Sequence, residues 1–216
     1  MYTLKKIHGL VTQIIVLVQS VKHLLTDISK RIKRRKKGEV RISISSGHGS
    51  LVAGASDILD EVTEARRVVR KVASHLRRMG AEVEEFHDDT SSTQTTNIDT
   101  IVGWHNNQAP DQINVSVHFN AFEPTGKPRG TEVLFEDPNL WALASRLSLV
   151  ISDAGGFRNR GSKHRFNLGF LNRIEGTAIL IEVCFVDSVE DARLYNKKFG
   201  AICKAIAKAL MAKDCR

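Results

Sequence analysis

The sequence has few cysteines, and none of them forms a metal-binding pair. Its 216 residues include only Cys184, Cys203 and Cys215, with no Cys-x-x-Cys spacing. This pattern argues against a zinc site built from thiolates and against a disulfide framework, so we expect reduced thiols in a protein made in a reducing compartment.

Long apolar runs are missing as well. The run at residues 14–18 is five residues long, whereas a membrane-spanning helix needs about twenty. Lys5 and Lys6 precede this run, but no small-x-small cleavage site follows it cleanly, which disfavours a signal peptide. We therefore expect synthesis in the cytoplasm without export by a signal sequence.

Three catalytic signatures are also absent. The sequence contains no His-Glu-x-x-His, no Gly-x-Ser-x-Gly and no glycine-rich phosphate loop. These absences exclude a thermolysin-like zinc site, a nucleophile elbow and nucleotide binding through a phosphate loop.

Positive charge is confined to the N-terminal segment. Residues 1–41 contain eleven Lys and Arg against Asp27 and Glu39, a net charge of +9, so residues 42–216 carry −1 of the total of +8. The basic run at residues 31–37 is typical of a solvated linker, and it could also hold an anionic partner such as a wall polymer or a membrane surface. Nucleic acid is disfavoured as a partner, because the body of the chain is near neutral and has no nucleic-acid motif.

The same segment shows a heptad pattern. Steps of three and four residues separate its apolar positions, which are Leu4, Ile7, Val11, Ile14, Val18, Val21, Leu25, Ile28 and Ile32. Such a pattern predicts a coiled coil and hence a homo-oligomer through residues 4–32, with an amphipathic helix docked on the domain or on an anionic membrane as the alternative. We therefore expect a basic helix and linker at residues 1–38 and a globular domain at residues 39–216.

From residue 40 onward, predicted strands alternate with predicted helices. The strands are expected at residues 40–45, 81–86, 112–120, 130–136 and 178–185, and the helices at residues 63–79, 95–108, 140–154 and 189–212. This order indicates an α/β fold with an open, mostly parallel twisted sheet, flanked by helices and preceded by the long N-terminal helix. Ligands of such sheets collect at the carboxyl ends of the strands.

Two histidines lie at those strand ends. His48 stands between Gly47 and Gly49 after the first strand, and His118 ends the third. We expect the glycines to let the backbone turn sharply, so that the His48 imidazole projects over the sheet edge. The other histidines, His105 among them, have no such setting and are expected at the surface.

A carboxylate stands in the most apolar strand. Glu182 lies within the sequence LIEVCF at residues 180–185, where an unpaired charge would be costly, so a cationic or strongly hydrogen-bonding partner is expected. One zinc ion would meet this need and would explain the histidines. A hydrolytic zinc site takes three nitrogen or oxygen ligands and leaves a fourth position to water.

The third ligand is expected from the helix that follows the first strand. Glu61 and Glu64 are three residues apart and could share one helical face, so periodicity does not separate them. We prefer Glu64, because it immediately precedes the amphipathic stretch and its first-turn position would point back toward the sheet edge. Glu61 could instead serve the helix N-terminal region, where negative charge is favoured.

Several sequence blocks in this order resemble one known family. They are Ser46-Gly47-His48-Gly49, Gly54-Ala55, Glu64, Ser116-Val117-His118-Phe119-Asn120-Ala121, Gly130-Thr131-Glu132 and Ile181-Glu182-Val183-Cys184-Phe185. Together they are similar to the zinc-dependent N-acetylmuramoyl-L-alanine amidases of amidase type 3, and especially to endolysins of phages that infect Gram-positive bacteria. The likeness covers residue 40 to about residue 210, although Ser45, Ser46 and Ser50 stand where many members have Asp-Pro and a second glycine.

The resemblance implies a site and a reaction. It assigns His48, Glu64 and His118 as ligands of one Zn2+ and Glu182 as the catalytic residue. The implied reaction cuts the amide between N-acetylmuramic acid and L-alanine of peptidoglycan at the bacterial cell wall, for lysis of a host cell. Zinc would lower the pKa of its water to about 7, and Glu182 would take the proton and pass it to the leaving amine. A non-catalytic wall-binding or scaffold protein of the same fold is the alternative.

The basic segment leads to a test of wall attachment. An oligomer that repeats a +9 segment would combine many weak contacts with anionic polymer by avidity. We expect the chain without residues 1–38 to bind purified cell walls more weakly and with less dependence on salt, measured by co-sedimentation across a NaCl series. Unchanged binding with an unchanged salt dependence would refute this role.

Overall fold

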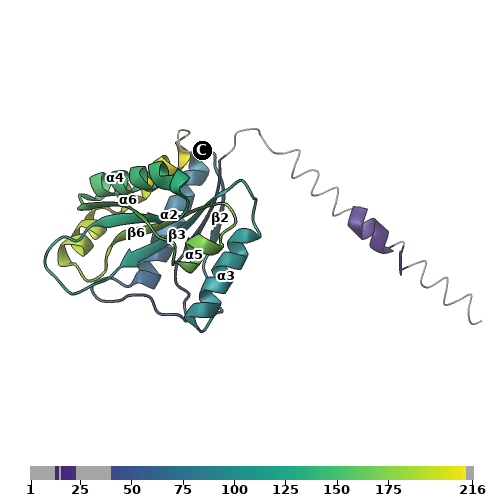
Figure 1. Ribbon diagram of the computed structural model, residues 1–216, viewed down its shortest axis with the longest axis horizontal. Coiled ribbons are helices and arrows are strands. Elements are labelled where there is room, and N and C mark those ends of the chain that lie inside the picture. The colour runs from purple at the N-terminus through teal and green to yellow at the C-terminus, as the bar shows by residue number, and fades with distance from the viewer. Residues whose placement is uncertain (1–12, 15, 23–39, 213–216) are drawn as a thin grey trace, which may run out of the picture. The chain divides into compact units, whose positions relative to one another are not determined.

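The computed structural model describes residues 13, 14, 16–22 and 40–212 (Figure 1). The chain divides into two units, residues 1–39 and residues 40–216. The described residues of the first unit are helical, and among the described helices none is long and apolar enough to span a membrane. Most of the heptad pattern at residues 4–32 lies outside the described residues, so the long N-terminal helix and its coiled coil stay predictions.

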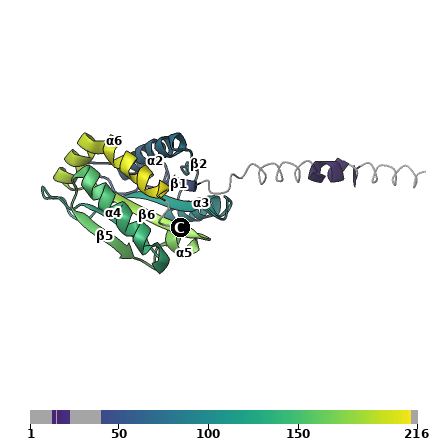
Figure 2. The same cartoon turned by 90° about the horizontal axis from the view of Figure 1, so that it is seen from above.

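The second unit is built on a six-stranded sheet with the order β2-β1-β3-β6-β4-β5, whose edge strands β2 and β5 are labelled in Figure 2. Its strands are β1 (Arg41–Ser46), β2 (Glu82–Phe86), β3 (Ile113–Asn120), β4 (Thr131–Phe135), β5 (Asn159–His164) and β6 (Thr177–Phe185). The strands β2, β1, β3 and β6 run parallel, β4 is antiparallel to β6, and β5 is parallel to β4. The expected open, mostly parallel α/β sheet is confirmed, and the most apolar strand lies inside it.

Helices cover the two faces of the sheet unequally. They are α2 (Glu61–Arg78), α3 (Gln94–Asn106), α4 (Trp141–Gly155), α5 (Gly169–Arg173) and α6 (Val189–Met211), with the 3-10 turn η1 (Pro138–Leu140) before α4. On one face α6 packs against both α2 and α4, while on the other the short α5 packs beside α3. The face under α3 and α5, called here the α3–α5 face, is the less covered one.

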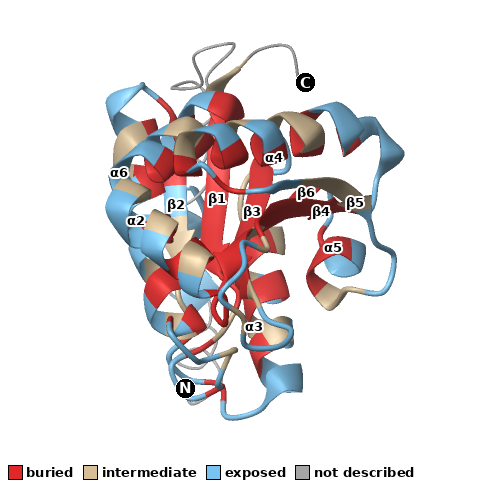
Figure 3. Cartoon of the chain, turned by 90° about the vertical axis from the view of Figure 1, so that its left-hand side faces the viewer, coloured by how far each residue is buried: buried red, intermediate tan, exposed pale blue. Residues whose placement is uncertain are grey.

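The side chains of β6 show this division directly. Ile179 and Ile181 belong to the large core with α2, α4 and α6, whereas Ala178 and Leu180 belong to a smaller cluster with α3 and α5. Because successive side chains of a strand point to opposite faces, Glu182 lies on the α3–α5 face. The inner strands are buried, while β2 and β5 at the edges are partly exposed (Figure 3).

Two elements, β5 and α5, have no counterpart in the sequence prediction. The strand β5 reads NRGSKH, lies at a sheet edge and contains no buried residue, so it shows no alternation of apolar and polar positions. The helix α5 has five residues, which is too short for helical periodicity to be recognised.

Helix α2 begins two residues before its predicted start. Asp60 is its N-cap, because the Asp60 Oδ1 atom accepts a hydrogen bond from the backbone N–H of Thr63 at 2.8 Å. This start puts Glu61 in the first helical position and Glu64 nearly one turn further along the helix.

His105 is a buried core residue, which corrects the expectation that it lies at the surface. Its side chain is 1% exposed and links α3 to the sheet. The Nδ1 atom lies 2.9 Å from Oδ1 of Asn114, and Nε2 lies 3.0 Å from the hydroxyl of Ser45. Burial lowers the pKa of His105 to about 4, since the charged imidazolium would lose its hydration there. The neutral ring is therefore the native form.

This burial predicts a pH dependence of stability. Above pH 6.5, the ordinary pKa of histidine, the ring is neutral in both states. As the pH falls from about 6.5 to about 4, the unfolded chain takes up a proton that the folded chain does not, so folding weakens by on the order of 3 kcal/mol. We expect His105→Gln to flatten this slope in urea unfolding measured from pH 7.5 to 4.5. The control His164→Gln, at an exposed position, should keep the wild-type slope; a wild-type slope in His105→Gln would contradict the account.

Candidate metal centre

His118 and Glu182 face the same side of the sheet on neighbouring strands. His118 on β3 is paired in register with Glu182 on β6, and Glu182 is paired on its other side with Glu132 on β4. Residues opposite one another in a sheet point to the same face, so these three side chains form a row on the α3–α5 face. The row lies toward the carboxyl ends of β3 and β6, where the sequence predicts ligand binding.

The loop after β1 holds His48 between two anchored glycines. The N–H of Gly47 donates to the carbonyl of Val117 at 2.9 Å, and the N–H of Gly49 donates to Oδ1 of Asn97 at 2.6 Å. A Cβ atom on Gly47 would lie 1.8 Å from Cε1 of His118, an impossible contact. The backbone bends at residues 47 and 48, as expected. Neither glycine has a positive φ, and Gly47 is required because the His118 ring occupies the space of a side chain.

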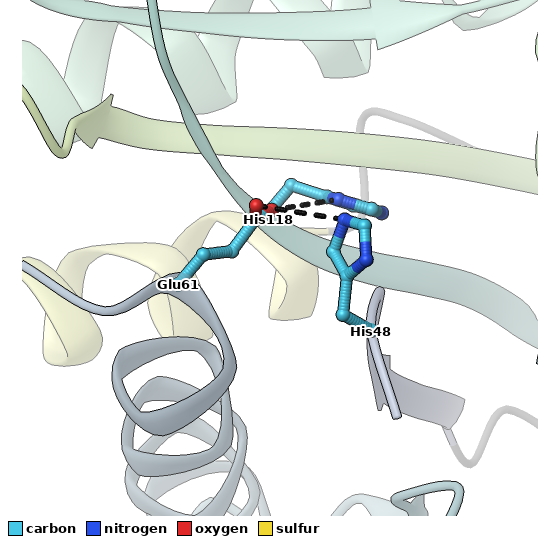
Figure 4. Close-up of side chains that lie close together, drawn as sticks. All are labelled: His48, Glu61 and His118. Atoms are coloured by element: carbon cyan, nitrogen blue, oxygen red, sulfur yellow. Dashed lines mark hydrogen bonds and ion pairs between the residues drawn. The ribbon is translucent and has the colours of Figure 1, made fainter. Parts of the chain in front are cut away.

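Glu61 joins the two histidines into one cluster (Figure 4). Its Oε1 atom accepts hydrogen bonds from Nδ1 of His118 at 3.0 Å and from the backbone N–H of Phe119 at 3.1 Å. Its Oε2 atom lies 3.5 Å from Nε2 of His48 and accepts from the N–H of Ala55 at 2.8 Å. One ligand atom from each of Glu61 and the two histidines lies within 4.8 Å of the others, a separation at which the three can share an ion.

Glu64 lies elsewhere, so the preference for it as the third ligand is corrected. Both of its carboxylate oxygens accept hydrogen bonds from Arg67, at 2.9 and 2.6 Å, and Oε2 also accepts from the buried Tyr195 hydroxyl at 2.7 Å. The reason is the position of the helix start: with Asp60 as N-cap, the first residue of α2 is Glu61, which meets the strand ends. Glu64 sits about 4.5 Å further along the axis and contacts α6.

The cluster is electrostatically suited to a cation. Burial raises the pKa of Glu182 to about 7; the neighbouring Glu61 and Glu132 add to this rise, while His118 opposes it. The Oε2 atom of Glu182 is buried and has no hydrogen-bond partner within the residues that the structure describes. Burial also lowers the pKa of His48, which keeps its imidazole neutral, the form that binds metal.

Neighbouring charges shift the pKa values of Glu61 and His118 against the effect of burial. Burial alone would raise the pKa of Glu61, but the hydrogen bond and charge of His118, together with His48, lower it overall. Burial alone would lower the pKa of His118, yet Glu61 and Glu182 outweigh that effect and raise it. Zinc binding would displace the proton that this rise favours on His118. Two neutral imidazoles and an ionised carboxylate form a donor set that Zn2+ prefers, so the residues present fit this ion.

Comparisons with known proteins agree on the fold. A family model described as N-acetylmuramoyl-L-alanine amidase matches residues 42–212. The catalytic domain of the CD27L endolysin targeting Clostridia difficile has a TM-score of 0.72 and 24% identity, over 80% of this chain and 97% of that one. The amidase AmiC2 of Nostoc punctiforme has a TM-score of 0.67 and 22% identity, over 83% and 99% of the two chains.

Curated relatives are longer than this chain. An uncharacterized protein of Clostridium perfringens (strain 13 / Type A) is 29% identical over 180 residues, which are 81% of this chain and 52% of that protein. A second uncharacterized protein of Clostridium perfringens, of 38.4 kDa, is 28% identical over 184 residues. The chain spans about half the length of the curated relatives it matches.

A matched pair of substitutions tests the third ligand. We expect Glu61→Gln to weaken Zn2+ binding by roughly 100-fold or more, because it removes the charged oxygen donor between the histidines. Glu64→Gln should keep wild-type affinity within about threefold and lower the free energy of unfolding by about 1 kcal/mol through its pair with Arg67. Competition titration with a chromogenic chelator and thermal unfolding measure the two effects. The reverse pattern, with zinc lost in Glu64→Gln alone, would show that the assignment to Glu61 is wrong.

Proposed function

Because this chain belongs to the N-acetylmuramoyl-L-alanine amidase family, we propose that it hydrolyses the amide bond between N-acetylmuramic acid and the L-alanine of the stem peptide in peptidoglycan. One Zn2+ would be held by His48, Glu61 and His118. The observation that carries the proposal is the meeting of these three residues beside the half-buried Glu182, on the less covered face of the sheet. A substrate needs such an open approach.

His48, Glu61 and His118 would bind the metal ion, and Glu182 would transfer the proton. When bound, Zn2+ lowers the pKa of a coordinated water to about 7 and polarises an amide carbonyl. The two histidines and Glu61 supply the nitrogen and oxygen donors, and the hydrogen bonds of Glu61 to the backbone of Ala55 and Phe119 fix its carboxylate in place. These contacts keep the donor set oriented without substrate, which reduces the reorganisation needed for the reaction.

Glu182 would move the proton. It accepts a proton from the attacking water and returns it to the nitrogen of the leaving L-alanine, a general base that becomes a general acid. Its pKa of about 7 applies to the site without an ion. Beside a cation the pKa would fall, so the carboxylate would be ionised at neutral pH, as a general base requires.

The cellular role follows from the substrate. The reaction takes place at the bacterial cell wall, and lysis of a host cell is the role that we propose, supported by the fold shared with an endolysin catalytic domain. The competing function is a wall-binding or scaffold protein without catalysis. The presence of both histidines, Glu61 and Glu182 in one cluster favours the enzyme, since a binding protein has no need of all four.

An assay on purified Gram-positive peptidoglycan tests the reaction. We expect new amino-terminal L-alanine to appear with the zinc-loaded chain and to disappear on chelation. Glu182→Gln should lower the rate by roughly 100- to 10,000-fold, the usual effect of losing a general acid or base, while zinc content and thermal unfolding stay near wild type.

Two results would count against the proposal. The first is a folded, zinc-loaded chain that releases no L-alanine ends from walls of several chemotypes, which would favour the scaffold function. The second is a Glu182→Gln variant with wild-type activity, which would remove Glu182 from the mechanism and leave the amidase assignment standing.

A further inference from the structure

A polar hollow lies next to Glu182 on the sheet. Its cavity volume is about 310 Å3, and the residues that line it include Asn120, Arg129, Glu132, Arg160 and Phe185. Asn120 is two residues beyond His118 on β3, Phe185 is three residues beyond Glu182 on β6, and Glu132 is the register partner of Glu182. The hollow is therefore continuous with the row of side chains at the metal centre.

Two guanidinium groups are held at the wall of this hollow. The Nε of Arg160 donates to Oε2 of Glu132 at 2.7 Å, and its guanidinium carbon lies 5.0 Å from the centre of the Phe185 ring. A terminal nitrogen of Arg129 donates to the carbonyl of Glu123 at 2.7 Å, and its guanidinium lies 5.7 Å from the centre of the same Phe185 ring. Hydrogen bonds and ring contacts thus fix both cations before any ligand arrives.

Both arginines keep donors for a ligand. The side-chain hydrogen bond of Arg129 uses one terminal nitrogen, and its buried Nε has no hydrogen-bond partner among the described residues. Within the part of the chain that the structure describes, the hydrogen bond recorded for the Arg160 guanidinium uses Nε alone, which leaves its terminal nitrogens for another acceptor. A guanidinium presents its donors in a plane that matches a carboxylate.

The charge of the hollow favours an anion. The two arginines face a single lining carboxylate, Glu132, so the ionisable lining groups sum to +1. Glu132 is already satisfied, because Oε1 accepts from Nδ2 of Asn120 at 3.0 Å and Oε2 accepts from Arg160. Glu132 therefore acts as a positioning residue that holds an amide and a guanidinium at the wall of the hollow.

The distance between the hollow and the metal centre indicates which part of the substrate would lie in the hollow. Asn120 lies roughly 6–7 Å along the strand from His118, at about 3.3 Å per residue. A carboxylate on the residue after L-alanine lies at a similar distance from the scissile nitrogen, since successive α-carbons are about 3.8 Å apart. On the other side of the scissile bond, the sugar and its lactyl group carry no free charge once the amide is formed.

We propose, on the basis of the function proposed above, that Arg129 and Arg160 bind the free α-carboxylate of the second stem residue, a glutamate linked through its γ-carboxyl group. The consequence is a preference for peptidoglycan in which this carboxylate is free over peptidoglycan in which it is amidated. Amidation removes the negative charge and replaces one acceptor oxygen by a donor group that faces the guanidinium donors.

The test compares two synthetic muramoyl tripeptides that differ only in amidation of this carboxylate. For the zinc-loaded full chain we expect kcat/KM to favour the free carboxylate by about 10- to 100-fold, mainly through KM, the usual range for a charge-assisted hydrogen bond. Arg129→Gln and Arg160→Gln should each reduce the preference to within about threefold, by slowing the free-carboxylate substrate alone. Arg129→Gln is the cleaner variant, because Arg160→Gln also removes a partner of Glu132. Arg158→Gln, at an exposed position outside the hollow, should keep the wild-type preference.

A binding measurement gives a readout that does not depend on turnover. Calorimetry with the free tripeptide product and its amidated form should show tighter binding of the free carboxylate, and this difference should be lost in both arginine variants. Equal kcat/KM for the two substrates, or a preference retained in both variants, overturns the subsite and leaves the amidase assignment intact. Cleavage of neither substrate by a folded, zinc-loaded chain overturns both.

Discussion

The carboxylate of Glu61 is the contact on which the candidate site depends. Its Oε1 atom accepts hydrogen bonds from His118 and from the backbone N–H of Phe119. Its Oε2 atom accepts from the backbone N–H of Ala55 and lies beside His48. Four segments meet there: the end of β3, the loop after β1, the loop at Ala55 and the start of α2. Such a carboxylate is stable in a buried position because it accepts three hydrogen bonds and lies beside the His48 imidazole. Metal binding then needs little rearrangement of the chain.

The helices cover one face of the sheet more than the other, and this leaves room for a polar site around Glu61. Helices α2, α4 and α6 bury one face and supply most of the core, so the alternate side chains of β3, β6 and β4 are free to carry polar groups on the other. His118, Glu182 and Glu132 lie in one row across three strands, and Arg160 on the edge strand β5 extends it into the neighbouring hollow. A rigid sheet holds these groups at fixed separations, which is what a reaction between a water and an amide requires.

The sequence predicted those parts of the structure whose signals are local. Alternating and apolar runs located every inner strand, and the strand-end positions of His48 and His118 followed from them. The choice between Glu61 and Glu64 was wrong because residues three positions apart on a helix share a face. The choice therefore depended on where the helix begins, and Asp60 sets that start as the N-cap. That signal was present in the sequence as an aspartate three residues before Thr63. The role of Gly47 could not be predicted, because the His118 ring that fills its side-chain space comes from a residue 71 positions away. The strand β5 was missed because its six residues are polar.

The central claim is that a single zinc ion lies between two strand-end histidines and the first residue of α2. Anomalous diffraction from zinc-soaked crystals of the full chain, recorded above and below the zinc absorption edge, tests it most directly. The account predicts an anomalous peak with His48, Glu61 and His118 as protein ligands at about 2.0–2.2 Å, with Glu64 still bonded to Tyr195. A peak coordinated by Glu64, or no peak between the histidines at saturating zinc, would contradict it.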